Sequence, residues 1–329
     1  MTILVTGGAG YIGSHTVTDL LDYDEEVIVL DNLQKGHAQA VPPGILMRGD
    51  VRDPETLHEI FANYEIEAVI HFAADSLVGE SAQEPLKYYD NNVIGAQRLL
   101  SAMQKHGVRK FVLSSTAAAY GEPQRVPIEE SDQTVPTNPY GETKLAIEKM
   151  LHWCDAAYGL KSVALRYFNA AGAHPSGKIG EDHQPESHLI PIVLQVALGQ
   201  REAIDIFGDD YPTTDGTCIR DYIHVMDLAQ AHRLALHYLR RNNSSRVYNL
   251  GNGQGFSVKE VIAQAREVTG QAIPWLVSAR RPGDPAVLVA SAARAQAELG
   301  WCPAYTGLQE IIATAWNWHK HHPQGFAGV

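Results

Sequence analysis

The chain has 329 residues, of which 45% are hydrophobic and 19% are charged. These proportions are typical of a globular protein and exclude an extended disordered chain or a coiled coil. Acidic residues outnumber basic ones by 38 to 26, which leaves a formal net charge of −12. A general nucleic-acid or anionic-membrane surface is therefore excluded, because such partners require a basic face. The length favours about two domains.

The cysteines and the histidine-rich tail indicate neither disulfides nor a metal. Cys154, Cys218 and Cys302 lie far apart in the chain, so they offer no disulfide framework and no zinc-ligand spacing. His319–His322 is more typical of a solvated terminus than of a metal site. We therefore predict no metal, free thiols in a reducing cytoplasm and no membrane span, because the apolar stretch Leu189–Leu198 is too short.

Strand-like and helix-like segments alternate along the first half of the chain. Because parallel strands need crossovers, this alternation predicts an α/β fold with a doubly wound, Rossmann-like parallel sheet. After about Gly172 the sequence is richer in Pro, Gly and Asp, which favours a second, smaller α/β lobe with long loops. The expected domains are residues 1–172 and 173–329, and the segment around 222–240 is able to return to the first. The predicted strands are Thr2–Thr6, Val27–Leu30, Ala68–Phe72, Lys110–Ser114 and Ser162–Tyr167.

A glycine-rich turn directly follows the first predicted strand. Gly7, Gly10 and Gly13 permit a tight turn, a close approach of the backbone to a pyrophosphate, and close helix packing. The helix that opens at Tyr11 and Ile12 offers free N–H groups to the phosphates. An ordinary strand–helix turn carries similar glycines, but the strand–turn–helix context favours a dinucleotide site.

Acidic residues follow the next predicted strands. Asp31 ends the second strand about 20 residues further on, where a carboxylate binds the adenine ribose hydroxyls of a dinucleotide. Because Asp31 repels a 2′-phosphate and no arginine is adjacent to it, the sequence favours NAD over NADP. Asp50 and Val51 follow a third strand-like stretch and either flank the adenine or simply cap a loop.

A tyrosine and a lysine four residues apart are predicted on one face of a helix. Thr137 or Asn138 is expected as the N-cap and Pro139 at the first helical position, which aligns Tyr140 with Lys144. The ammonium would favour the phenolate, lower the pKa of Tyr140 and make the phenol a usable general base. A surface Tyr and Lys share this spacing, but the nearby dinucleotide loop favours the catalytic interpretation.

Thr116 follows the fourth predicted strand at the edge of the sheet where ligands bind. Its hydroxyl either hydrogen-bonds the phenol and a substrate hydroxyl or caps a turn. The glycine loop, Thr116 and the Tyr140-x-x-x-Lys144 spacing together resemble the extended short-chain dehydrogenase/reductase superfamily. Further segments resemble the UDP-glucose 4-epimerase family and run through nearly the whole chain. They are His71–Ala74, Tyr88–Val93, Leu165–Asn169, Phe207–Thr217, Arg220–Val225 and Arg280–Asp284.

The resemblance implies an NAD-dependent interconversion of UDP-glucose and UDP-galactose through a 4-keto sugar, with Tyr140 as general base and Lys144 and Thr116 beside it. It implies that Arg220 and Arg281 clamp the phosphates. The implied cofactor residues are Gly7, Gly10, Tyr11, Ile12, Gly13, Asp31, Asn32, Asp50, Val51, Phe72, Ala73, Ala74, Asn91, Tyr140, Lys144 and Tyr167. The implied substrate residues are Thr116, Tyr140, Asn169, His188, Leu189, Phe207, Arg220, Arg281, Asp284 and Leu288.

The resemblance also implies a homodimer that pairs two helices of each chain. These helices, near Tyr88–Lys105 and Gly141–Tyr158, carry apolar positions on more than one face. One sheet alone is not expected to bury both faces. The positions are Leu99, Leu100, Met103, Ile147, Met150 and Leu151.

Four positions depart from the family pattern. Thr116 stands where many relatives have serine, and its hydroxyl keeps the role. Ser76 stands where some relatives have lysine, and His188 stands where relatives often have asparagine. Leu288 falls where the side chains of relatives vary in size, which leaves activity on N-acetylated sugars open.

Three alternative functions fit the sequence less well. A 4,6-dehydratase needs an acid and a base where Ala117 and Ala118 stand. A non-catalytic NAD-bound scaffold usually lacks the tyrosine or the lysine, and an NADP-dependent reductase is disfavoured by the acidic group after the second strand.

Overall fold

A sheet of seven parallel strands forms the centre of the computed structural model, which describes residues 1–281 and 284–328. The strand order is β10-β6-β5-β4-β1-β2-β3, and the strands from β3 to β6 have the order of a Rossmann fold. The predicted fold class is confirmed. The strands are β1 (Thr2–Thr6), β2 (Val27–Asp31), β3 (Leu46–Arg48), β4 (Ile66–His71), β5 (Lys110–Ser114), β6 (Lys161–Arg166) and β10 (Arg246–Asn249).

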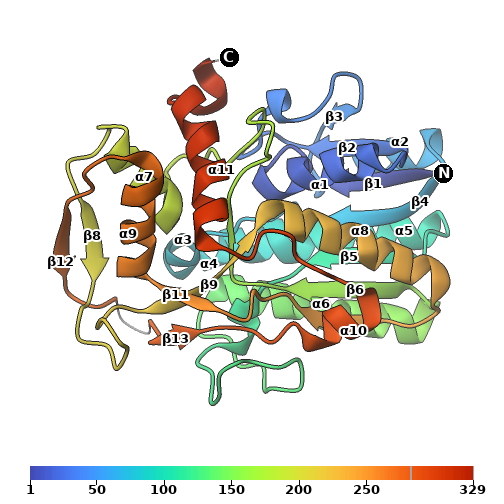
Figure 1. Cartoon of the computed structure of the whole chain (residues 1–329). Helices are drawn as coiled ribbons and strands as arrows, with labels where there is room; N and C mark the ends of the chain where they lie inside the picture. The colour runs from blue at the N-terminus through green and yellow to red at the C-terminus, as the bar shows by residue number, and fades with distance from the viewer. Residues whose placement is uncertain (282–283, 329) are drawn as a thin grey trace.

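Helices cover both faces of this sheet because successive side chains of each strand point to opposite sides. Ile3 and Val5 of β1 pack on one face with α1 and α8, and Leu4 packs on the other face with α2, α5 and α6. Figure 1 shows α1 and α8 lying side by side over the strands. The bounds are α1 (Tyr11–Asp22), α2 (Pro54–Asn63), α5 (Gly95–Lys105), α6 (Pro139–Tyr158) and α8 (Val225–Arg241).

The helix expected over Tyr88–Lys105 is interrupted. A short helix, α4 (Pro85–Tyr88), runs into a π-helical turn over Tyr89–Ile94, and only then does α5 begin. π-Helical turns commonly occur at functional sites, and this turn contains Asn91. The short helix α3 (Val78–Gln83) precedes it.

The argument that α5 and α6 need a partner to bury their apolar positions is wrong. Every one of those positions except Met150 is buried within the single chain, and Met150 is partly buried. They pack on the apolar core between the helices and the sheet, because a helix that lies between a sheet and another helix presents two apolar faces inward. The buried positions are Leu99, Leu100, Met103, Ile147 and Leu151.

The remaining elements form a second part with short strands, which lies at the left of Figure 1. β9 (Ile219–His224) pairs with β7 (Asn169–Ala171), β11 (Gly255–Ser257) and β13 (Val287–Leu288), and β8 (Ile204–Phe207) pairs with β12 (Trp275–Ser278). We call this part the small-sheet region and the seven-stranded sheet with its helices the large-sheet region. The helices of the small-sheet region are α7 (Leu189–Ala197), α9 (Val258–Thr269) and α11 (Leu308–His321).

The chain passes between the two regions more than once. After β9 it returns to the large-sheet region through α8 and β10, so the returning segment extends beyond the expected residue 240 to Asn249. Helix α10 (Ala293–Leu299) also packs against α8 and β10. Short 3₁₀ turns lie at Ala38–Ala40, Ala117–Tyr120 and Gly325–Gly328. Across the described parts of the chain, no helix has the length and apolar character needed to cross a membrane.

Candidate active site

The glycine-rich turn between β1 and α1 is packed too closely for a side chain at Gly7 or Gly13, whereas Gly10 has ordinary contact distances. Gly7 has a φ of +72°, and a Cβ there would lie 2.5 Å from the backbone nitrogen of Ala73. A Cβ on Gly13 would lie 2.2 Å from the carbonyl oxygen of Gly7. The turn therefore lies directly against Phe72 and Ala73 at the end of β4, and Ala74 follows half-buried. This is a backbone cradle of the kind that admits a pyrophosphate.

Asp31, at the end of β2, holds this turn in place. One carboxylate oxygen accepts from the backbone N–H of Ala9 at 3.0 Å and the other from that of Leu33 at 2.8 Å. Burial raises the pKa of Asp31. A carboxylate accepts about four hydrogen bonds, so this group retains capacity for two ribose hydroxyls.

Asp50 is part of an ion pair. The guanidinium of Arg52 donates to both of its carboxylate oxygens, at 2.9 and 2.7 Å, and the Asn32 amide donates to it at 3.1 Å. These contacts hold the pKa of Asp50 well below its usual range. Val51, the next residue, is buried. Asp50 was expected either to flank the adenine or to cap a loop, and its own contacts show that it stabilises the loop.

Tyr11 and Ile12 begin α1 and connect it to the rest of the molecule. The Tyr11 hydroxyl donates to the carbonyl oxygen of Gly172 at 2.6 Å, which links the glycine turn to the start of the small-sheet region. Ile12 packs against the apolar core of the sheet. Tyr11 also has the edge of its ring against His183.

The N-terminus of α6 forms as the sequence predicts. Asn138 is the N-cap and accepts from the backbone N–H of Gly141, with Pro139 at the first helical position. Tyr140 and Lys144 lie on this helix, and the Lys144 ammonium donates to the carbonyl oxygen of Ser114 at 2.9 Å. The lysine is therefore anchored to the carboxyl end of β5.

Thr116 caps the turn that follows β5. Its hydroxyl accepts from the backbone N–H of Ala118 at 3.1 Å, and its position near the phenol lowers the pKa of Tyr140 slightly. Tyr167 lies nearby, with its hydroxyl hydrogen-bonded to Ser114. Hydroxyl groups and an ammonium thus converge at the carboxyl ends of β5 and β6.

The electrostatics differ from the sequence-based expectation. Burial raises the pKa of Tyr140, and the smaller effect of Thr116 lowers it. Burial also lowers the pKa of Lys144 to about 8. Both shifts have one cause, because a low-dielectric site disfavours either charge. Among the described residues, Lys144 does not lower the pKa of Tyr140 toward neutral pH, so the predicted lowering is not found.

Two buried polar networks that the sequence analysis missed support these residues. Asn92, next to Asn91 in the π-helical turn, donates to the Asp75 carbonyl oxygen and to Thr143 on α6, both at 3.0 Å. On the other side of α6, Glu148 accepts from Ser115 and Arg166. A buried polar residue at Asn92, inside an otherwise helical pattern, was the available signal.

The predicted phosphate ligands lie in the small-sheet region. Arg220 on β9 forms an ion pair with Asp284, and the Arg281 guanidinium lies 4.0 Å from the centre of the Phe207 ring at the end of β8. Asn169 donates from its side chain to the carbonyl oxygen of Asp221 at 3.0 Å. The motif residues Pro282 and Gly283 lie outside the described residues.

Leu288 connects this group to the catalytic residues. It pairs with Arg220 in the sheet, and its side chain packs against the cluster of Ala117, Tyr120 and Ile128 that follows Thr116. The predicted sugar-contacting leucine is thus near the threonine.

His188 and Leu189 stand at the start of α7, as its N-cap and its first helical residue. Burial lowers the pKa of His188, but the carboxylates of Glu181 and Glu186 outweigh this effect and raise it to about 10. His188 is therefore directed toward acidic groups of its own loop, and no described contact connects it to Arg220 or Thr116.

The geometry agrees with what comparisons with known proteins show. The model of the NAD dependent epimerase/dehydratase family matches residues 3–251. A UDP-glucose 4-epimerase of Halalkalibacterium halodurans is 65% identical over 99% of this chain and 98% of the relative.

Solved structures of epimerases have the same fold over the whole chain. One UDP-glucose 4-epimerase structure is 58% identical, with a TM-score of 0.97 and 99% of each chain covered. Another, from Bifidobacterium longum in complex with NAD⁺ and UDP, is 41% identical, with a TM-score of 0.94 and coverage of 99% of this chain and 100% of that one. The chain therefore belongs to the NAD-dependent epimerase/dehydratase family, within its UDP-glucose 4-epimerase group.

Proposed function

We infer that the chain interconverts UDP-glucose and UDP-galactose with bound NAD. The observation that carries this inference is the group of buried Thr116 and Lys144 and half-buried Tyr140 at the strand ends, beside a glycine turn in which Gly7 and Gly13 leave no room for a side chain. Full-length similarity to UDP-glucose 4-epimerases supplies the substrate class.

NAD would be held by the glycine turn, Asp31 and the residues at the end of β4. Bound there, NAD would supply reversible hydride transfer at carbon 4 of the sugar. Asp31 binds the adenine ribose and disfavours a 2′-phosphate by charge repulsion. Phe72, Ala73, Ala74 and Asn91 complete the walls of this site.

Tyr140 takes the proton of the sugar 4-hydroxyl and returns it in the second half of the reaction. Thr116, beside the phenol, hydrogen-bonds that sugar hydroxyl and orients it. Lys144, fixed by the carbonyl oxygen of Ser114, reaches the nicotinamide ribose. Because burial alone raises the pKa of Tyr140, the phenol depends on the positive charge of the oxidised nicotinamide to become a base near neutral pH. Tyr167 shapes the nicotinamide site.

The uridine diphosphate is bound by the small-sheet region. Arg220 and Arg281 clamp its two phosphates, a role that suits the planar guanidinium, and Asp284 exchanges part of its ion pair with Arg220 for a ribose hydroxyl. Phe207 lines the uracil pocket. Further contacts come from Asn169, Leu189 and Leu288, whereas His188 faces Glu181 and Glu186 instead.

One experiment tests the function directly. Purified chain is incubated with UDP-galactose and no added NAD, and UDP-glucose is measured by anion-exchange chromatography. Formation of UDP-glucose is expected. A 4-keto-6-deoxy product would identify a dehydratase instead, which Ala117 and Ala118 make unfavourable because neither can transfer a proton. An absolute requirement for added NADP would overturn the assignment of the cofactor.

We also propose a homodimer in the cytoplasm. Exposed apolar side chains in the π-helical turn before α5 and on α6 support the dimer. Ile94 in the turn is 43% exposed, and Trp153 and Tyr158 on α6 are 69% and 47% exposed. The three cysteines are free thiols, which suits a reducing compartment. Light scattering at micromolar concentration is expected to give twice the chain mass, and a monomer mass would contradict the dimer.

A further inference from the structure

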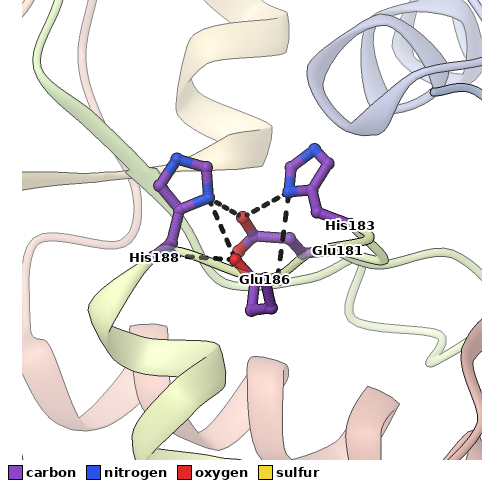
Figure 2. A group of neighbouring side chains, drawn as sticks. All are labelled: Glu181, His183, Glu186 and His188. Atoms are coloured by element: carbon purple, nitrogen blue, oxygen red, sulfur yellow. Dashed lines mark hydrogen bonds and ion pairs between the residues drawn. The ribbon is translucent and has the colours of Figure 1, made fainter. Parts of the chain in front are cut away.

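Two histidines and two glutamates meet in the loop that precedes α7, outside the catalytic group. Figure 2 shows Glu181, His183, Glu186 and His188 pointing toward one another from one short segment. One potential ligand atom from each residue lies within 4.8 Å of all the others. The sequence analysis predicted no metal because it examined cysteine spacing and the histidine tail.

The separations suit a shared small cation. Nδ1 of His188 lies 2.6 Å from Glu181 Oε1 and 3.4 Å from Glu186 Oε1, and Nδ1 of His183 lies 3.1 Å from Glu181 Oε1 and 3.9 Å from Glu186 Oε2. Ligands about 2.0–2.2 Å from a tetrahedral ion are about 3.3–3.6 Å apart. Of the four separations, those at 2.6 and 3.1 Å are shorter than this spacing, the one at 3.4 Å lies within it and the one at 3.9 Å is longer.

Two features distinguish this cluster from an ordinary surface ion pair. The side chains of Glu181 and Glu186 are only 3% and 5% exposed, and two neighbouring buried carboxylates are costly without a strong positive charge. Within the described parts of the chain, the buried Nδ1 of His188 makes no hydrogen bond. This nitrogen faces both carboxylates at ion-pair distance, so a metal ion bound here would displace its proton.

The segment is held in place by contacts to its backbone and by backbone N–H groups that fix the Glu186 carboxylate. Trp318 on α11 donates to the Glu181 carbonyl oxygen at 3.2 Å, and Lys35 donates to that of Gln184 at 2.8 Å. The backbone N–H groups of Ser187 and His188 donate to the Glu186 carboxylate at 2.7 and 2.8 Å. Such outer contacts orient metal ligands and limit the entropy lost on binding.

We propose that Glu181, His183, Glu186 and His188 bind one divalent transition-metal ion, with zinc as the reference ion. The donor set decides the class, because imidazole nitrogens favour zinc and its neighbours, whereas calcium and magnesium prefer oxygen ligands alone. The ion cross-links residues 181–188 beside Tyr11 and the glycine turn. Its role is structural, it has no part in the hydride or proton transfer, and it does not depend on the proposed epimerase activity.

Calorimetric titration tests the site on full-length chain purified without a histidine tag and stripped with EDTA. Zn²⁺ is expected to bind at one ion per chain, with a dissociation constant of about 1 µM or below, and to raise the melting temperature. His183→Gln and Glu181→Gln should each weaken binding about 100-fold or more, since each removes a ligand. The visible absorption of a Co²⁺ substitute reports tetrahedral geometry independently.

The matched control is His321→Gln, which removes an exposed histidine from the tail and should leave zinc binding unchanged. Circular dichroism of the two ligand variants in EDTA establishes that they are folded. The proposal is overturned if Zn²⁺ fails to bind below 1 mM (roughly the weak end for a specific site). It is equally overturned if only the tail variant loses binding, or if Mg²⁺ and Ca²⁺ bind as tightly as Zn²⁺.

Discussion

The large-sheet and small-sheet regions hold their candidate residues in different ways. In the first, Thr116 and Asp31 at strand ends and Lys144 on α6 are fixed by hydrogen bonds to backbone groups. In the second, Arg220 is held by the carboxylate of Asp284, and Arg281 by the ring of Phe207. Backbone groups therefore hold the proposed catalytic residues, whereas other side chains hold the proposed phosphate ligands. Substitutions in the first region should reduce kcat, and those in the second should raise KM.

The largest effect is expected for Tyr140→Phe. Loss of the general base should lower kcat about 10²- to 10⁴-fold, while NAD and UDP-sugar remain bound because the packing of the ring is kept. Tyr158→Phe, an exposed tyrosine on the same helix, is the matched control. Near-normal turnover by Tyr140→Phe would remove the phenol from the mechanism.

Arg220→Met should act mainly on KM. Removal of a charged hydrogen-bond donor to phosphate should raise KM for UDP-galactose about 10- to 100-fold, with a smaller change in kcat. Arg246→Met, which removes another arginine ion-paired to a carboxylate, controls for a general loss of charge. A fall in kcat with KM unchanged would contradict the proposal that the small-sheet region binds the substrate while the large-sheet region carries out the reaction.

Leu288 lies where the two regions meet, so its substitution sharpens the comparison. Leu288→Cys should raise the rate with N-acetylated sugar relative to UDP-galactose, and Leu288→Tyr should suppress it, because the pocket gains or loses volume. Apolar discrimination of this kind reaches about 10- to 200-fold at most. An equal ratio of the two rates in all three proteins would show that Leu288 is not the gate.

Asp221→Asn should affect stability and leave turnover least changed. Burial raises the pKa of Asp221 to about 7, well above the value of an unfolded chain. Between these values the folded chain binds a proton that the unfolded chain has released, so stability falls as pH rises, by at most about 1.4 kcal/mol per pH unit. The variant lacks this dependence. Urea unfolding at pH 5 and pH 8 checks it, and parallel pH profiles for the two proteins would contradict it.

Elements that depend on residues close in sequence were predictable, whereas elements that depend on distant contacts were not. The cap at Asn138 and the strand before the glycine turn were correctly predicted, since both depend on residues within one or two turns of chain. The π-helical turn at Tyr89–Ile94 was not, because its sequence is compatible with a regular helix. β13, only two residues long, exists by pairing with β9 and has no pattern of its own.

The electrostatic expectations failed for a related reason. Tyr140 and Lys144 lie on one helix as their spacing predicts, but burial dominates both pKa values, and burial is a property of the whole fold. Likewise, Leu99 and Met103 were interpreted as needing a partner helix, whereas the sheet and α2 and α6 enclose them. The Glu181–His188 spacing was present in the sequence, but no rule based on cysteines detects it.

The return of the chain through α8 and β10 has a consequence for folding on the ribosome. Helix α8 covers the same face of the sheet as α1, and β10 completes the edge beside β6. A nascent chain that ends at residue 172 therefore exposes Val112, Val163 and the unpaired edge of β6 to solvent. The first domain in sequence cannot finish folding before residue 249 has been synthesised, and a fragment cut at 172 should aggregate rather than form an autonomous NAD-binding unit.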